Sequence, residues 1–572
     1  MSLFTSFLFA LMTSMLLVPV LQRYAGRLGL IDTPDPRKVH ERLVPRSGGV
    51  AIVAGALLPI VLWAPADSLL AHLLLGAMVI VLIGLVDDRQ DLDYRLKFAG
   101  QALAALIAMR GGLLIEVWPF FGIDPVPAAL SYPTTFMFLI GVTNAINFSD
   151  GLDGLAGGIS LVTLGAIAFI AGTPAGQDLT QTALEMMVGD AEQGRHIALY
   201  SIAIIGGLCG FLRYNNYPAQ IFMGDTGSQF LGFMTAGLAI ALTQHFDTAL
   251  NPAIVLLLFG LPILDTFSVM IWRVRTGQSP FRADRKHFHH RLLDMGFKHY
   301  EAVSTIYVVQ ALLVLAALAV RFSADVVVIS IYLLASALIV IGFRVARVSD
   351  WRLRAPSEPG VFVERRNLWL RGMPWLHPVS VSMVEAGFAS LVALAALSPL
   401  SFAPGVGIAS LVAGVGLLLT LRLSGRRRRL LRRITLYGAA VLSVFVLETA
   451  DAGGAAIVPK IAVNALTLAL VGALVVAIRV TRRSRFSTSP LDILILIFVV
   501  VVLLLGADVA TPLAPLSQVG AVLDQDQAVA RLAVLFYATE LLSSKGNRYL
   551  NLLSGAAGSC LLLMGMRALL LG

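Results

Sequence analysis

Apolar runs long enough to cross a bilayer recur along almost the whole chain of 572 residues. A membrane-spanning helix needs about 20 mostly apolar residues. Such runs lie in the N-terminal part at 3–21, 48–64, 69–86, 98–110, 128–146, 155–172, 196–213, 230–245, 252–272, 303–321 and 325–345. Others follow at 379–400, 404–423, 436–450, 457–479, 490–507, 528–543 and 552–571. The pattern predicts an all-α polytopic membrane protein, with about eleven spanning helices in a core and about seven in a C-terminal extension.

The composition supports a membrane protein. Hydrophobic residues make up 57% of the chain and charged residues 13%, whereas soluble domains carry about 25% charged residues. The first run has no basic segment before it and is interpreted as a span, not as a removable signal. The formal net charge is +9, but Lys and Arg collect in the cytoplasmic loops of membrane proteins. We therefore expect the lipid bilayer as a partner and no nucleic acid.

The basic residues predict the topology. If the loop at 22–47 is cytoplasmic, alternation of the spans places four more loops on the same face, at 87–97, 147–154, 214–229 and 273–302. The first, second and last of these loops carry most of the Lys and Arg residues of the core. The positive-inside rule therefore assigns all five loops to the cytoplasm.

The same five loops hold nearly every unusual polar cluster of the core. A transporter or lipid flippase is expected to place ionisable residues at the bilayer midplane and to show repeat symmetry. The spans between residues 1 and 345 show neither pattern. An active site at the cytoplasmic membrane surface is the favoured interpretation.

Three acidic motifs lie at the mouths of spans on this face. Asp87 and Asp88 belong to GLVDDRQDLD, Asp150 and Asp153 to NAINFSDGLDGLAGG, and Asp225 to FMGDTGS. An unpaired carboxylate at the membrane is costly without water or a cation. Mg²⁺ typically joins one or two carboxylates to substrate phosphates. Each acid taken alone is equally well explained as a solvated helix end, but three acidic mouths together favour a magnesium site.

Two basic loops complete the set of candidate residues. The last loop places His287, His289 and His290 near Arg282, a combination that suits a diphosphate or sugar hydroxyls better than a closed metal cage. The alternative is a basic hairpin attracted to anionic lipid. The first loop is stiffened by prolines and could receive a lipid phosphate or a nucleotide; its candidate residues are Arg37, His40 and Arg46.

Taken together, the five loops resemble those of a known family. The segments are DTPDPRKVHERLVPRSGG, GLVDDRQDLDYRLKFAGQ, NAINFSDGLDGLAGG, NNYPAQIFMGDTGSQFLG and DRKHFHHRLLDMG. They are similar, in order and topology, to the cytoplasmic loops of the polyprenyl-phosphate N-acetylhexosamine-1-phosphate transferases. The resemblance covers about residues 1–345.

The resemblance implies roles at the matching positions. Asp225 is a Mg²⁺ ligand with Asp150 as its companion and Asp153 close by, and Mn²⁺ is an expected substitute. Asp87 and Asp88 lie by the lipid phosphate. The implied substrate contacts are Lys97 to phosphate, Asn215 in the nucleotide region, and the His287–His290 tract to the nucleotide-sugar. Asn147 is a further expected substrate-binding residue.

The histidine motif also indicates the substrate. HFHH resembles the HIHH form of the N-acetylglucosamine-1-phosphate initiators, with Phe288 in place of an aliphatic residue. The expected reaction transfers N-acetylglucosamine 1-phosphate from the UDP-sugar to undecaprenyl phosphate and releases UMP. It takes place at the cytoplasmic face of a bacterial inner membrane and starts a cell-surface polysaccharide such as lipopolysaccharide O-antigen. Alternatives are phospho-N-acetylmuramoyl-pentapeptide transfer, a polyprenyl-lipid transporter and a non-catalytic scaffold; a homodimer is left open.

The resemblance ends before the last third of the chain. We predict a transferase core at 1–346, a polar interfacial linker at 347–378 with three tryptophans, and a C-terminal membrane domain at 379–572. An accessory domain without its own chemistry is favoured there over a lipid-handling, partner-binding or flippase-like module.

Overall fold

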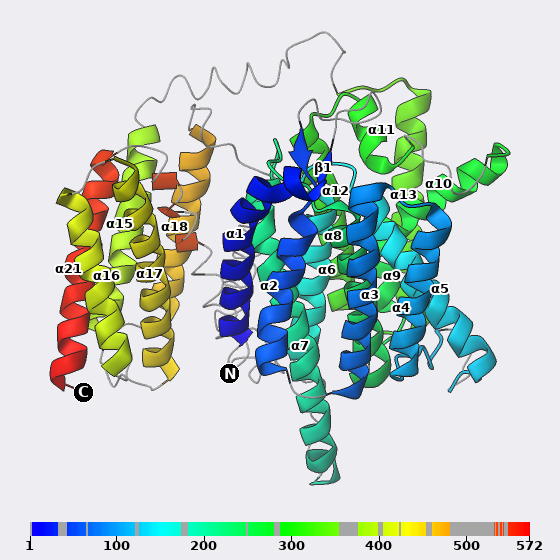
Figure 1. Ribbon diagram of the computed structural model, residues 1–572, viewed down its shortest axis with the longest axis horizontal. Helices are drawn as coiled ribbons and strands as arrows, with labels where there is room; N and C mark the ends of the chain where they lie inside the picture. The colour runs from blue at the N-terminus through cyan, green and yellow to red at the C-terminus, as the bar shows by residue number, and fades with distance from the viewer. Residues whose placement is uncertain are drawn as a thin grey trace. The chain divides into compact units, whose positions relative to one another are not determined.

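In the residues that the structure describes, the protein is all-α apart from one short β-ribbon. The chain divides into two compact units, Met1–Ser357 and Glu358–Gly572. The structure is a computed structural model (Figure 1). It describes residues 3–32, 43–64, 67–119, 125–172, 181–246, 250–278, 286–353, 376–398, 404–422, 425–452, 460–480 and 547–571, and single residues between 531 and 542. In 181–193 only the backbone is described.

The first unit is a bundle of helices. Its elements are α1 Leu3–Leu28, β1 Ile31–Asp32, β2 Val44–Pro45, α2 Gly48–Trp63, α3 Ser68–Gln90, α4 Tyr94–Arg110, α5 Ala128–Phe148, α6 Leu155–Gly172, α7 Gln181–Asn215, α8 Gly224–Ile240, the π-helix η1 Ala241–Phe246, α9 Ile254–Leu258, α10 Gly260–Arg275, α11 Phe288–Asp294, α12 His299–Ala319 and α13 Asp325–Val348. β1 and β2 pair antiparallel, with Ile31 opposite Pro45.

Helix α8 lies at the centre of this unit. Every residue from Thr226 to Ile240 is buried, and α2, α3, α5 and α6 pack around it. Glycines let the neighbours approach closely: a Cβ at Gly84 of α3 would lie 2.7 Å from Cα of Thr226, and one at Gly49 of α2 would collide with the backbone N of Gly227. Close packing of small residues is the usual means of helix association in membranes. It brings the start of α8 against the end of α3.

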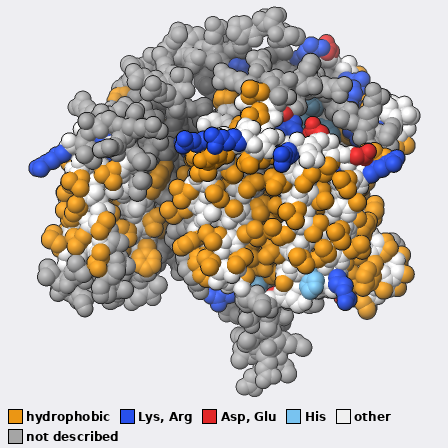
Figure 2. Space-filling model, in the orientation of Figure 1, with side chains coloured by type: hydrophobic (Ala, Val, Ile, Leu, Met, Phe, Trp, Pro, Cys, Tyr) orange, Lys and Arg blue, Asp and Glu red, His pale blue; other side chains and the backbone are white. Residues whose placement is uncertain are grey.

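The exterior of the first unit suits a bilayer. Figure 2 shows hydrophobic side chains covering the helical body of this face, with Lys and Arg gathered along its upper edge, where β1 and α11 lie in Figure 1. Seven of the described helices are long and apolar enough to cross a membrane, six of them in the first unit. The prediction of an all-α polytopic membrane protein is thereby confirmed, and the counts of eleven and seven spans stay predictions.

The prediction of one continuous spanning helix at 252–272 is wrong. The run 252–272 forms two helices, α9 and α10, with a break between Leu258 and Gly260. Pro262 has no N–H to donate to the carbonyl of Leu258 four residues earlier. That carbonyl instead accepts hydrogen bonds from Thr163 Oγ1 at 2.9 Å and Gln310 Nε2 at 2.7 Å. Two neighbouring helices therefore stabilise the break.

Other boundaries of the first unit also shift. The predicted span at 230–245 begins earlier, at Gly224, and changes from α-helix to π-helix at Ala241. The predicted span at 196–213 is part of a much longer helix, α7. The loop predicted at 273–302 contains the short helix α11.

The second unit is a separate helical bundle. It comprises α15 Leu376–Leu397, α16 Pro404–Arg422, α17 Gly425–Ala452, α18 Lys460–Val480 and α21 Asn547–Leu571. Helix α15 packs against α18 and α21, and α16 packs against α17 and α21. Five of the seven predicted C-terminal spans coincide with these helices. The span at 490–507 and most of the span at 528–543 lie outside the described residues, as does 354–375 of the predicted linker.

Candidate active site

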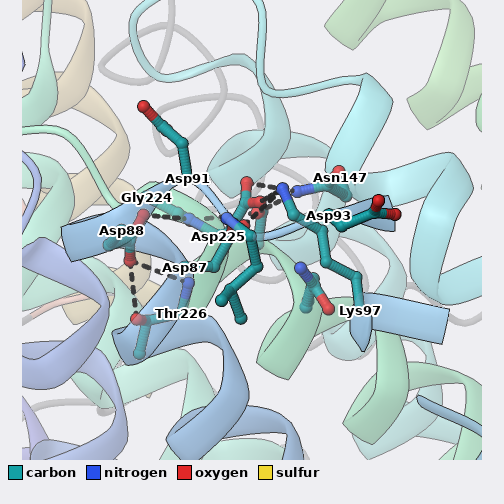
Figure 3. A network of polar contacts seen from close by, with 12 residues as sticks. Asp87, Asp88, Asp91, Asp93, Lys97, Asn147, Gly224, Asp225 and Thr226 are labelled. Atoms are coloured by element: carbon teal, nitrogen blue, oxygen red, sulfur yellow. Dashed lines mark hydrogen bonds and ion pairs between the residues drawn. The ribbon is translucent and has the colours of Figure 1, made fainter. Parts of the chain in front are cut away.

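Four of the predicted residues meet where α3 and α5 end and where α4 and α8 begin (Figure 3). Lys97 Nζ lies 2.5 Å from Asp87 Oδ2 and 3.0 Å from Asp225 Oδ2. Asn147 Nδ2 donates to the other oxygen of Asp225 at 3.0 Å and to Ser228 Oγ at 2.8 Å. One ammonium group thus bridges two carboxylates that are 138 positions apart in the sequence (225 minus 87).

Asp88 points away from this bridge and caps the start of α8. Its Oδ1 accepts the backbone N–H of Asp225 at 2.8 Å. Its Oδ2 accepts the N–H of Thr226 at 3.0 Å and the Thr226 hydroxyl at 2.6 Å. The first N–H groups of a helix have no partner inside it, and a carboxylate there is favoured by the helix dipole. Asp88 therefore fixes the backbone from which the Asp225 side chain projects.

Gly224 is required for this cap. Its φ of +67° is in the left-handed region, and a Cβ there would collide with both carboxylate oxygens of Asp88. We expect Gly224→Ala to lower the free energy of unfolding by about 1–3 kcal/mol and to reduce activity, because the cap has to move. Thermal unfolding in detergent and the turnover rate measure both effects. Gly141→Ala is the control, since a Cβ at Gly141 meets nothing within 4 Å; equal behaviour of the two variants would contradict the cap.

Asp150 lies in the loop between α5 and α6. Among the described residues no hydrogen bond to its carboxylate is found, and the side chain is half-buried. Burial, together with the negative charges of Asp225, Asp153 and Asp88, raises the pKa of Asp150 to about 8. This part of the site is therefore short of positive charge.

The donor set fits a hard divalent cation. Asp150 and Asp225 offer carboxylate oxygens, and Lys97 is the cation that contacts Asp87 and Asp225 in the described part of the chain. Within those residues, no group of three or more His, Cys, Asp or Glu side chains could hold a metal by itself. Mg²⁺ usually takes one or two carboxylates and completes its shell with water and substrate phosphates, so a preformed protein cage is not needed.

Asp153 and Asn215 join the third and fourth loops to each other. Asp153 Oδ2 accepts the N–H of Ala219 at 2.8 Å. Asn215 is buried; its Oδ1 accepts the N–H of Gly154 at 2.9 Å and its Nδ2 donates to the carbonyl of Ile221 at 2.7 Å. These bonds hold the SDGLDG loop in place. The catalytic role of Asp153 and the nucleotide contact of Asn215 stay predictions.

The histidine tract packs onto the same loop. His289 is 3% exposed, and a Cβ at Gly151 would collide with its Nε2. The His289 ring lies parallel to that of His287, with 5.8 Å between the centroids, and 4.3 Å from that of His290. Burial lowers the pKa of His289 well below its usual value, and His290 and His287 lower it further. His289 is therefore neutral near pH 7.

The first loop is described only in part. Arg37 and His40, and also Arg282 of the last loop, lie outside the described residues. Arg46 forms an ion pair with Asp32 of β1 and lies 3.5 Å from Asp91. Its guanidinium thus connects the β-ribbon to the second loop, and the predicted substrate contact of Arg46 stays a prediction.

Comparisons with known proteins identify the family of this chain. The model of glycosyl transferase family 4 matches residues 70–243. A probable undecaprenyl-phosphate N-acetylglucosaminyl 1-phosphate transferase of Bacillus subtilis is 33% identical over 308 residues, which are 53% of this chain and 81% of that protein. The chain belongs to glycosyl transferase family 4. The resemblance seen in the five loops is thereby confirmed.

Other members of family 4 match to a similar extent. A decaprenyl-phosphate N-acetylglucosaminephosphotransferase of Mycobacterium leprae is 34% identical over 50% of this chain and 75% of that protein. An undecaprenyl-phosphate alpha-N-acetylglucosaminyl 1-phosphate transferase of Escherichia coli K12 is 30% identical over 51% of this chain and 77% of that protein. The family 4 segment 70–243 includes Asp87, Asp88, Asp150, Asp153 and Asp225.

One residue of this family 4 site was not predicted from the sequence. Asp265 of α10 is buried, and its Oδ2 lies 2.9 Å from His287 Nδ1. Its Oδ1 accepts the N–H of Phe288 at 2.8 Å, which caps α11 from outside. Asp265 therefore fixes both the His287 ring and the start of the helix that carries the other histidines. The available signal was a carboxylate inside the predicted span 252–272, which requires a partner. The interpretation of the spans as free of ionisable residues is therefore wrong at Asp265.

We expect Asp265→Asn to raise KM for the nucleotide-sugar by about tenfold, the value of one lost charged hydrogen bond, and to lower kcat less. The reason is that His287 and α11 lose their orientation while the carboxylates at Asp225 stay in place. Steady-state kinetics with varied donor measure the split between KM and kcat, and Asp265→Glu should restore part of the affinity. Asp325→Asn, a carboxylate bonded to Asn251, is the control; an unchanged donor KM in Asp265→Asn refutes the role.

Proposed function

We propose that this chain transfers N-acetylglucosamine 1-phosphate from UDP-N-acetylglucosamine to undecaprenyl phosphate, with release of UMP. The observation that carries the proposal is the bridge between Asp87, Lys97 and Asp225, at loops predicted to be cytoplasmic. The names of the family 4 relatives state the same transfer for those proteins. We place the reaction at the cytoplasmic face of a bacterial inner membrane, as the first step of a cell-surface polysaccharide.

In this proposal the lipid phosphate attacks the β-phosphorus of the donor directly. A phosphate monoester has a second pKa of about 6, so its oxyanion is already formed at cytosolic pH. A covalent phospho-aspartyl intermediate is therefore unnecessary. Catalysis of phosphoryl transfer rests mainly on positioning and on electrostatic stabilisation. Lys97 supplies positive charge between Asp87 and Asp225, where the phosphates have to meet.

The two adjacent aspartates receive different roles. Both oxygens of Asp88 are occupied by the N–H groups and hydroxyl at the start of α8. Asp87 instead contacts Lys97 and accepts the N–H of Leu92 at 2.7 Å. We therefore assign Asp87 to the lipid phosphate, where it orients the nucleophile and takes any remaining proton, and Asp88 to the positioning of Asp225.

Mg²⁺ on Asp225 and Asp150 would neutralise the diphosphate of the donor and the charge that develops on the departing UMP. Both residues present carboxylate oxygens, the ligands that hard cations prefer. Mn²⁺ has the same preference and is expected to substitute. Asn147 holds one oxygen of Asp225 by its amide at 3.0 Å and leaves the carboxylate with a fixed orientation.

Magnesium affinity is expected to rise with pH. In the metal-free protein the pKa of Asp150 is raised to about 8, so its carboxyl is protonated at pH 6.5. Metal ligands have to be deprotonated, and binding therefore releases this proton. Between pH 6.5 and 8 the apparent affinity should increase by about tenfold per pH unit while the proton is bound. Calorimetry in buffers of different ionisation enthalpy counts the proton. Asp150→Asn should bind more weakly and with a shallower pH dependence than the unmodified protein. A flat profile in the unmodified protein contradicts this ligand.

The substrate is tested by a donor panel. Purified protein is incubated with undecaprenyl phosphate, Mg²⁺ and one of UDP-N-acetylglucosamine, UDP-N-acetylgalactosamine or UDP-N-acetylmuramoyl-pentapeptide, and UMP is measured. The proposal predicts UMP release with UDP-N-acetylglucosamine that requires the lipid and is abolished by EDTA. Turnover with the pentapeptide donor alone would reassign the substrate. Folded protein that turns over no donor would support a non-catalytic scaffold.

A further inference from the structure

Two arginines of the second unit meet at one neutral oxygen. Arg428 and Arg432 lie one turn apart on α17, and both donate through Nη2 to Oδ1 of Asn551 on α21. The Arg432 bond is 2.9 Å long. Arg432 also lies 3.4 Å from the carbonyl and the hydroxyl of Thr420 on α16. The two guanidinium groups therefore join three helices that pack side by side (Figure 1).

Among the described residues, this arginine pair has no counter-charge. Arg432 is 3% exposed, and in the described part of the chain no carboxylate contacts either guanidinium. Nε of Arg428 is buried and has no hydrogen-bond partner there. Removing a charge from water costs several kcal/mol unless an opposite charge replaces the water, and two adjacent cations also repel each other. An Asn and a Thr oxygen do not supply that charge.

A topological role does not explain the burial. Arg residues that only set orientation extend their guanidinium groups into the interfacial water. Arg422, at the end of α16, is exposed in this way. Arg432 instead inserts between α16, α17 and α21. Such an insertion is typical of a site that receives an anion, and arginine donors match the oxygens of a phosphate.

Exposed apolar side chains stand next to Thr420 and Asn551, the two residues that contact the pair. Leu419 and Leu421, on either side of Thr420, are 52% and 40% exposed, and Leu552, next to Asn551, is 64% exposed. In a membrane protein such side chains contact acyl chains. A ligand with a charged head and an apolar tail matches this juxtaposition better than a free ion does.

We propose that α16, α17 and α21 form a binding site for the phosphate head group of a membrane lipid, with Arg428 and Arg432 as its phosphate contacts. The arginines lie in the first part of α17, and the Arg run at 426–429 falls on the cytoplasmic side if the alternation of spans continues through the second unit. The site is formed wholly by the second unit and is independent of the proposed transfer reaction. It gives this unit a lipid-handling task, in place of the accessory role without chemistry that the sequence favours.

The test is lipid binding to the full-length protein in detergent, followed by native mass spectrometry. The probes are dioctanoyl phosphatidylglycerol, dioctanoyl phosphatidylcholine, a short polyprenyl phosphate and inorganic phosphate. The unmodified protein is expected to bind the phosphatidylglycerol and polyprenyl phosphate, and the Arg428→Gln/Arg432→Gln variant to bind them about tenfold more weakly. Arg422→Gln/Arg347→Gln removes the same charge from two exposed positions and should bind as the unmodified protein does.

The outcomes separate the sources of the phosphate. If inorganic phosphate displaces bound phosphatidylglycerol from the unmodified protein but not from the double variant, the arginines form an anion site. If inorganic phosphate displaces phosphatidylglycerol only weakly, the ligand of this site is a lipid and not free phosphate. Equal binding of phosphatidylglycerol by the double variant and the unmodified protein overturns the proposal, as does equal binding of phosphatidylglycerol and phosphatidylcholine. If the double variant does not fold, the single variant Arg428→Gln, at the less buried position, replaces it. Phosphatidylglycerol binding by this variant is then judged by the same criteria. UMP release is measured in parallel and should be unchanged, so failure here is distinct from failure of the transfer reaction.

Discussion

Asp225→Asn is expected to lower kcat of UMP release by about 10³-fold while the protein stays folded. The substitution keeps the size of the side chain and removes its charge. The carboxylate of Asp225 accepts from Lys97 at 3.0 Å and from Asn147 at 3.0 Å, so an amide would leave one of these donors facing an NH₂ group. The proposed Mg²⁺ would also lose one of its two protein ligands. Single-turnover kinetics at saturating donor and lipid measure the change.

The control for Asp225→Asn is the same exchange at Asp350, a carboxylate that is 82% exposed and pairs only with Arg352 among the described residues. Its kcat should be unchanged. Thermal unfolding checks that both variants are folded. Activity of Asp225→Asn within about threefold of the unmodified enzyme is incompatible with Asp225 at the reacting phosphates.

Asp88→Asn is expected to have the second largest effect, a loss of about 10²-fold in kcat together with about 2–3 kcal/mol of the free energy of unfolding. Three donors at the start of α8 converge on the two oxygens of Asp88. An asparagine has a single oxygen, so its NH₂ group would face the N–H of Asp225 or Thr226. The start of α8 then shifts, and Asp225 shifts with it. Turnover and denaturant unfolding measure the two losses.

Asp93→Asn is a matched control for Asp88→Asn. Asp93 caps α4 by accepting the N–H of Arg95 at 2.8 Å, and asparagine is as good an N-cap residue as aspartate. Its kcat and stability should be close to those of the unmodified protein. Unchanged kcat in Asp88→Asn would show that Asp88 does not position Asp225.

The proximity of Asp87 and Asp225 could be predicted, because the topology alone places both at the ends of spans on one face of the membrane. The boundaries of α6 were equally accessible, since Leu155–Gly172 is the apolar run itself. The division of labour between Asp87 and Asp88 could not be predicted. Adjacent residues on a helix point about 100° apart, and only the packing of α3 against α8 decides which one faces the cap.

Contacts between residues far apart in the chain could not be predicted from the sequence either. Nothing near Asp265 indicates that its carboxylate meets His287, because the residues between α10 and α11 have no periodic pattern. The division of 252–272 into two helices depends on side chains of α6 and α12 that satisfy the carbonyl of Leu258. In the sequence, Arg432 is one more basic residue in a run of arginines. Its burial could not be predicted, because it results from the packing of three helices.

The central claim is that a sugar 1-phosphate, and not the sugar alone, passes to the lipid. The most direct test uses UDP-N-acetylglucosamine labelled with ³²P at the β-phosphate, with the protein in liposomes that contain undecaprenyl phosphate and Mg²⁺. The account predicts that the label moves into the lipid fraction, that unlabelled UMP appears in equal amount, and that Asp225→Asn abolishes both. Label that stays in soluble UDP while the sugar enters the lipid, or label released as inorganic phosphate, would contradict it.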